Sequence, residues 1–148
     1  STQHVAFVVK DERRAEFVEW KEIVSRKDLI IGIPEKFFYE KAIADNFTNG
    51  KAWKISTPRL FFKDEYKHID AMLFGAPTAS AWTLLYPSYT VVAPQPLIPA
   101  LTMAFPINKD DLSFELFMRN WIKMKQKDKT IKKLFRYWIE GKKPALTL

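Results

Sequence analysis

The residues best placed to bind a ligand follow two short apolar runs, residues 29–33 and 69–74. They are Pro34 and Glu35 after the first run, and Gly75, Ala76, Pro77, Thr78 and Ser80 after the second. Each run suits a buried strand, and a proline just after it suits the first turn of a helix, where its missing N–H is not needed. Such turns offer hydroxyls and, at a helix N-terminus, backbone N–H groups, which are a natural place for a carboxylate or another anion to bind. That Gly and Pro simply make tight turns here remains the alternative.

Residue types suited to catalysis are sparse. The paired acids Asp64-Glu65 and Asp110-Asp111 fall at predicted helix starts, where the helix dipole favours negative charge. Asp70 lies at the start of a predicted strand, where we expect a structural acid. His4 and His68 lie far apart in the sequence, and there is no cysteine to act as a nucleophile or zinc ligand. The four glycines form no phosphate-binding motif. We therefore expect no enzyme activity, no cofactor and no metal.

Size and composition predict one globular domain over residues 1–148. The hydrophobic share is 47% and the aromatic share 15%, which exclude a disordered chain. No apolar run approaches the roughly 20 residues that span a bilayer, and no secretory signal is visible. The chain begins almost at once with a strand, so we expect a fragment of a longer protein.

The net charge of +7 comes from one region. Residues 119–143 hold ten Lys or Arg against only Asp128 and Glu140, so the rest of the chain is close to neutral. A solvated helix face explains this best, with an anionic membrane or partner as the alternative. Nucleic acid is not expected as a partner.

Strands and helices alternate along the chain, which predicts an α/β domain with a three-layer, mainly parallel sheet flanked by helices. Strands are expected at 5–9, 29–33, 52–56, 69–74, 91–93 and 101–107. Helices are expected after Asp11, which should cap the first, and then at about 35–49, 57–67, 76–86 and 110–127, with a last helix ending at Gly141. Leu84 and Leu85 are expected on an apolar helix face with Ala79, Ala81 and Trp82. The inner face of the long helix is expected to hold Phe114, Phe117, Met118, Trp121 and Ile122.

The order of these motifs resembles the second lobe of the family 3 extracellular solute-binding proteins, which have the type II periplasmic binding fold. The resemblance rests on His68 to Ala93, and on Asn120-Trp121, residues 130–134 and the ending Tyr137-Trp138-Ile139-Glu140-Gly141. Residues 80–94 more narrowly resemble solute-binding domains fused to symporter-type membrane proteins. The resemblance implies noncatalytic, extracytoplasmic binding or sensing of a small solute, including an anionic one, as part of a transporter or receptor. The implied partners are a first lobe or a parent membrane protein.

Two positions depart from the pattern of that family. Gly75 stands where its amino-acid binders usually carry Asp, and Ile33-Pro34-Glu35 stands where they usually carry Thr. Both departures disfavour an ordinary α-amino acid as ligand, and a single lobe should bind weakly or not at all. The same fold also serves cytoplasmic effector domains of transcription regulators and dehydratase-like enzymes, which remain the alternatives.

Overall fold

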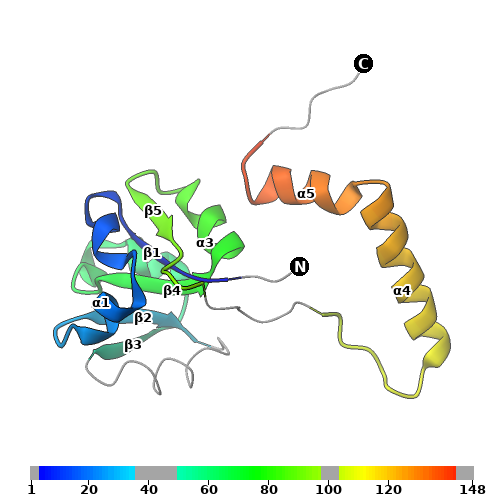
Figure 1. The fold of residues 1–148 in the computed structure, drawn as a ribbon, viewed down its shortest axis with the longest axis horizontal. Coiled ribbons are helices and arrows are strands. Elements are labelled where there is room, and N and C mark those ends of the chain that lie inside the picture. Colours follow the sequence, from blue (N-terminus) through cyan, green and yellow to red (C-terminus); the bar gives the residue numbers. More distant parts are fainter. Residues whose placement is uncertain (1–3, 36–49, 98–103, 143–148) are drawn as a thin grey trace. The chain divides into compact units, whose positions relative to one another are not determined.

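A computed structural model describes residues 4–35, 50–97 and 104–142. The chain forms two compact units, residues 2–101 and residues 102–148 together with Ser1, each described separately below (Figure 1). One lobe over residues 1–148 stays a prediction. No helix among the described residues is long and apolar enough to cross a bilayer.

The first unit is built on a five-stranded sheet with the order β3-β2-β4-β1-β5. The strands are β1 Val5–Lys10, β2 Ile30–Pro34, β3 Lys51–Ile55, β4 Ala71–Gly75 and β5 Tyr89–Val92. β2 runs parallel to β3 and β4, whereas β1 lies between β4 and β5 and is antiparallel to both. Since only β1 is reversed, the prediction of a mainly parallel α/β sheet is confirmed.

Side chains that alternate along the strands form a core on each face of the sheet. On one face Phe7, Val9 and Leu73 pack with Phe17 and Ile23, which come from η1 Asp11–Phe17 and α1 Trp20–Ser25. The opposite face holds a second cluster, contributed by η2 Pro58–Phe62, α3 Ala76–Thr83 and the sheet itself; it comprises Val8, Ile55, Phe61, Ile69, Met72, Phe74 and Ala79. Helices therefore cover both faces, as expected for three layers (Figure 1).

The helix predicted after Asp11 is divided in two by a tertiary contact. Glu19 has extended backbone angles between η1 and α1, and it forms an isolated parallel bridge with Gln95. Gln95 N–H donates to the Val18 carbonyl, and Trp20 N–H donates to the Gln95 carbonyl. Lys10 is the N-cap of η1, and no side-chain hydrogen bond caps it, so the expected cap by Asp11 is wrong.

Three further expectations are corrected. Residues 57–67 form two short 3-10 helices, η2 and η3 Asp64–Tyr66, because Lys63 is extended between them. Leu84 and Leu85 are exposed, since α3 ends at Thr83. Residues 104–107 form no strand, and Pro106 cannot donate to a ladder. The helix predicted at 35–49 lies outside the described residues, apart from Glu35, which is in a turn.

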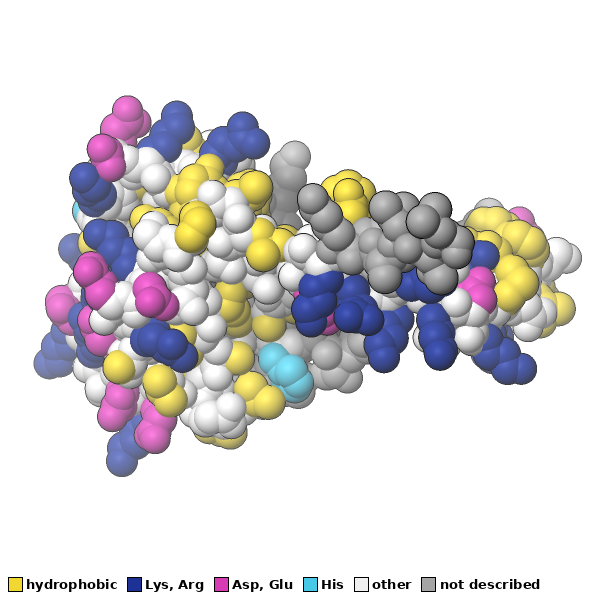
Figure 2. Space-filling view, turned by 90° about the horizontal axis from the view of Figure 1, so that it is seen from above, with side chains coloured by type: hydrophobic (Ala, Val, Ile, Leu, Met, Phe, Trp, Pro, Cys, Tyr) yellow, Lys and Arg dark blue, Asp and Glu magenta, His cyan; other side chains and the backbone are white. Residues whose placement is uncertain are grey.

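The C-terminal unit consists of α4 Leu112–Lys127 and α5 Thr130–Trp138. Asp111 caps α4 by accepting a 2.9 Å hydrogen bond from the Phe114 N–H. Gly141 follows α5 at φ 65°, a left-handed conformation that glycine adopts without strain. Neither helix buries a side chain, which differs from the expected inner face of α4, and Figure 2 shows apolar and basic side chains at the surface of this unit.

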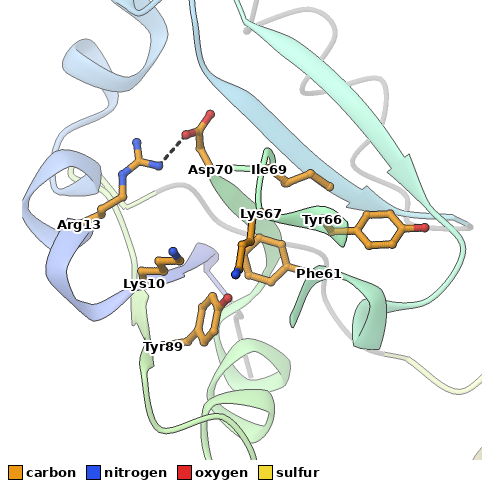
Figure 3. A pocket seen from close by; sticks show the side chains of 8 residues that line it. All are labelled: Lys10, Arg13, Phe61, Tyr66, Lys67, Ile69, Asp70 and Tyr89. Carbon is orange, nitrogen blue, oxygen red and sulfur yellow. Dashed lines mark hydrogen bonds and ion pairs between the residues drawn. The ribbon is translucent and has the colours of Figure 1, made fainter. Parts of the chain in front are cut away.

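Asp70 fastens the start of β4 to two other elements. Its carboxylate accepts a 2.8 Å hydrogen bond from the Ile30 N–H and an ion-pairing hydrogen bond from Arg13, drawn dashed in Figure 3. Arg13 also donates to Glu16 at 2.7 and 2.9 Å, and Glu16 accepts from Arg26 as well. Asp70 is thus the structural acid that its position at a strand start predicts.

Replacing Asp70 with alanine should destabilise the first unit by about 2 kcal/mol, because a backbone N–H and a guanidinium lose their acceptor. Chemical denaturation measures this cost. Asp64→Ala is the matched control, since Asp64 pairs with Lys67 at 3.0 Å while its side chain is 90% exposed. That change should cost less than about 0.5 kcal/mol. Equal costs for the two variants would contradict a structural role for Asp70.

Low pH should weaken the ion pairs that Glu16 forms with Arg13 and Arg26. The hydrogen bond from Arg13, reinforced by Arg26, lowers the pKa of Glu16 from 4.5 to about 2. The stability it provides is complete above the unfolded pKa and is lost as the pH falls from about 5 towards 2. Because the Glu16 side chain is 37% exposed and screened by water, we expect its ion pairs to contribute about 1 kcal/mol to the free energy of unfolding. Urea unfolding across this range should show a smaller pH dependence for Glu16→Gln than for the wild type.

Candidate functional site

The two predicted binding turns lie next to each other at one edge of the sheet. β2 and β4 are adjacent and parallel, so the turn at Pro34 and Glu35 and the turn that starts at Gly75 leave the sheet on the same side. The carboxyl ends of parallel strands are where open α/β sheets bind ligands. The structure therefore brings the residues 34–35 and 75–80 together, while binding there stays a prediction.

Backbone groups at these turns are less available than the sequence suggests. Glu35 N–H donates to the Ile55 carbonyl at 2.8 Å, and Ala76 N–H donates to the His4 carbonyl at 2.8 Å. Pro77 has no N–H, so the first turn of α3 offers a ligand chiefly the N–H of Thr78. Gly75 is extended at φ −72°, which any residue can adopt, so the turn does not need the conformational freedom expected of glycine here.

The side chains at this edge differ in what they offer. Glu35 and Thr78 are exposed, Ala76, Pro77 and Ser80 are half-buried, and Pro34 and Gly75 are buried. Within the described residues, neither Glu35 nor Thr78 uses its side chain in a hydrogen bond or ion pair. A ligand would therefore meet a carboxylate from one turn and a hydroxyl from the other.

Two residues at the same edge were missed from the sequence. Ser56 follows β3, whose last residue Ile55 pairs with Pro34, so the rule that selected Glu35 also selects Ser56. His4 precedes β1, where Val5 pairs with Gly75, and its Nδ1 is buried with no hydrogen-bond partner among the described residues. No sequence signal places His4 there, because an apolar run does not reveal that its strand is antiparallel.

A small pocket lies at the opposite edge of the sheet, where β4 begins and β1 ends. Its volume is about 40 Å³, and Lys10, Lys67 and Tyr89 contribute polar groups to it beside Asp70 (Figure 3). Burial raises the pKa of Tyr89. This volume holds a few water molecules at most and is far below the roughly 300 Å³ of a small-molecule site.

Three of the acids and histidines that were set aside as catalytic candidates make contacts that support the fold. Asp64 pairs with Lys67, Asp111 caps α4, and exposed His68 packs edge-on against Trp53 at 4.8 Å between ring centroids. Across residues 4–35, 50–97 and 104–142, no group of three metal-ligating side chains is found.

No protein-family model and no curated protein matches this sequence. Solved structures do match its fold. An ancestral cationic amino acid solute-binding protein superposes with a TM-score of 0.76 at 21% identity, covering 94% of this chain and 59% of that one. An amino acid ABC transporter substrate-binding protein from Streptococcus pneumoniae, bound to L-arginine, gives 0.74 at 16% identity, covering 94% and 60%.

An ancestral cyclohexadienyl dehydratase has a TM-score of 0.59 at 17% identity, covering 95% of this chain and 58% of that one. The α/β fold of periplasmic-binding-protein-like neighbours, expected from the order of the motifs, is thereby confirmed. The chain spans about three-fifths of the length of these structures.

Substitutions at the two free side chains should leave the fold intact. Glu35→Gln and Thr78→Ala should each change the free energy of unfolding by less than about 0.5 kcal/mol, since both side chains are exposed and neither forms a hydrogen bond or ion pair within the described residues. Chemical denaturation of the two variants beside the wild type tests this. A loss above about 1 kcal/mol for either would show that the side chain supports the fold and is not held ready for a ligand.

Proposed function

We propose that this chain supplies one side of a small-solute-binding cleft in an extracytoplasmic, noncatalytic binding or sensing protein of a transporter or receptor. The observation that carries the proposal is the shared edge of β2 and β4, where Glu35 follows β2 and Thr78 lies in the first turn of α3 after β4. Neighbours in fold named as solute-binding proteins support the same reading.

The chemistry of this edge favours a solute with a cationic group. Glu35 contributes an exposed carboxylate, and Thr78 a hydroxyl. Two of the N–H groups that would have favoured an anion are already bonded within the fold, those of Glu35 and Ala76. An ammonium or guanidinium group facing Glu35 therefore fits this edge better than the anionic solute that helix N-termini alone suggest.

The missing half of the cleft would come from a first lobe or from another part of a parent membrane protein. A two-sided cleft buries most of its ligand, whereas one side alone leaves the cost of association poorly compensated. A fusion to a symporter-type protein is one form that the parent could take, and the superposed structures name ABC-type transport instead.

An enzyme of the dehydratase kind remains the second candidate, because one neighbour in fold is an ancestral dehydratase. Among the described residues, His4 and Glu35 are the titratable groups at this edge that such chemistry could use. A cytoplasmic effector domain of a regulator is supported by no observation beyond the fold class.

Titration of the ¹⁵N-labelled chain with L-arginine tests the proposed site. We expect chemical-shift changes confined to the amides of residues 4, 35, 56, 75, 76 and 78–80, with a dissociation constant weaker than about 1 mM because only one side of the cleft is present. Glu35→Gln should abolish these changes, and the matched dianion succinate should produce none at this edge.

Submicromolar affinity for L-arginine in calorimetry would contradict the half-cleft proposal. Shift changes that map to another surface, or that persist unchanged in Glu35→Gln, would contradict the site itself. Thr78→Ala serves as a second variant, for which a weaker loss is expected because it removes a neutral hydrogen bond.

A further inference from the structure

The turn between α4 and α5 lies within a dense group of lysines. Residues 123–133 hold six lysines against the single Asp128, which gives this stretch a net charge of +5. Lys125 pairs with Asp128 at 3.2 Å. The other five lysines, which we call the lysine corner, form no ion pair within the described residues; they are Lys123, Lys127, Lys129, Lys132 and Lys133. In Figure 2, Lys and Arg side chains line one side of the C-terminal unit.

We propose that the lysine corner docks this chain on an anionic membrane surface, where phosphates of the lipid headgroups neutralise its charge. Each Lys or Arg near such a surface is attracted to it, and a cluster of roughly four to eight is typical of segments that bind anionic lipids. The lysine corner falls within that range. Charge complementarity therefore selects the partner.

The spacing of the lysine corner brings like charges together on each helix. Lys123 and Lys127 are one turn apart on α4. Lys129 and Lys133 are one turn apart at the start of α5, where the Lys133 N–H donates to the Lys129 carbonyl at 2.9 Å. Side chains four positions apart are neighbours on a helix, so each pair costs stability by repulsion. A surface of negative charge would relieve both repulsions.

Lys129 has a backbone conformation that lysine seldom adopts. Its φ of 64° lies in the left-handed region, which glycine and asparagine favour. The turn itself is held by Asp128, whose carboxylate accepts a 2.8 Å hydrogen bond from the Thr130 N–H. A lysine at position 129 thus adds a charge between the two pairs at a cost in backbone strain. Strain of this kind is typical of residues that serve a function.

The rest of the chain cannot balance the charge of the lysine corner. The whole chain carries +7 and residues 123–133 supply +5 of it, so the remainder is +2. Acids elsewhere in the chain could pair with these lysines only by leaving other cations unpaired. Because unpaired lysines are almost never buried, the lysine corner is suited to a partner outside the chain.

The type of cation favours a membrane over a nucleic acid. Arginine can bind a phosphate through two parallel hydrogen bonds, whereas lysine acts as a compact point charge. Both arginines of α4 and α5, Arg119 and Arg136, already pair with Glu115 and Glu140. The lysine corner therefore offers a diffuse attraction to a charged surface, which requires no groove and no base to be recognised.

Co-sedimentation of the whole chain with lipid vesicles tests the docking. Vesicles of equimolar phosphatidylcholine and phosphatidylglycerol should bind the wild type at least about tenfold more tightly than vesicles of phosphatidylcholine alone. Raising the salt concentration from about 0.1 M to about 1 M shortens the Debye length from about 10 Å to about 3 Å, so this binding should be lost. The salt comparison needs no variant and decides the question even if a variant fails to fold.

Two double variants that remove the same charge locate the surface. Lys127→Gln combined with Lys132→Gln should weaken binding to the anionic vesicles at least about tenfold, because each lysine contributes about fivefold. Lys21→Gln combined with Lys51→Gln, which lie in α1 and β3, is the matched control and should weaken binding less than about twofold. Glutamine has nearly the helix propensity of lysine, so α4 and α5 should persist.

Failure of the wild type to bind the anionic vesicles, or binding that persists at high salt, would overturn the docking. Equal weakening by the two double variants would exclude the lysine corner as the surface. Tighter binding to duplex DNA than to the anionic vesicles, lost in the Lys127→Gln and Lys132→Gln variant, would assign the lysine corner to a nucleic acid instead.

Discussion

The sheet of the first unit depends on β1, the strand that runs against all the others. Val5 to Val9 are buried on both faces, and the strand lies between β4 and β5, which it holds in one sheet. Side chains that alternate along β1 enter both cores, so Phe7 contacts the cluster under η1 and α1 while Val8 contacts the one under α3. The reversed direction also brings His4 beside Gly75, where the His4 carbonyl binds the Ala76 N–H.

Because backbone groups at that edge of the sheet are already bonded within the fold, few of them are available to the proposed solute. The N–H groups of Glu35 and Ala76 donate to the carbonyls of Ile55 and His4, and these hydrogen bonds hold both turns in place. What remains for a solute is carried by side chains, chiefly the carboxylate of Glu35 and the hydroxyl of Thr78. At the opposite edge, hydrogen bonds of Asp70 with Arg13 and with the Ile30 N–H link β4 to η1 and β2.

Apolar runs located β1, β2 and β4 because burial on both faces leaves a continuous apolar segment, as at Ile31 and Leu73. The shared edge of the two candidate turns followed from the same runs. The antiparallel direction of β1 could not be predicted, since an apolar run reads alike in both directions. Residues 11–25 gave a helical period, but the contact of Val18–Trp20 with Gln95 is long-range and breaks the helix. The acceptors of the Glu35 and Ala76 N–H groups could not be predicted either, because both hydrogen bonds join segments that are far apart in the sequence.

The place of β1 in the sheet also constrains the order in which the first unit can assemble. Although β1 comes first in the chain, its partners are Gly75 and its neighbours in β4 and then Tyr89–Val92 in β5. None of its ladder hydrogen bonds can form until the chain has been synthesised as far as β4. Closing so long a loop costs entropy before any contact repays it, which slows folding. A strand that is buried along almost its whole length is therefore among the last to find its partners.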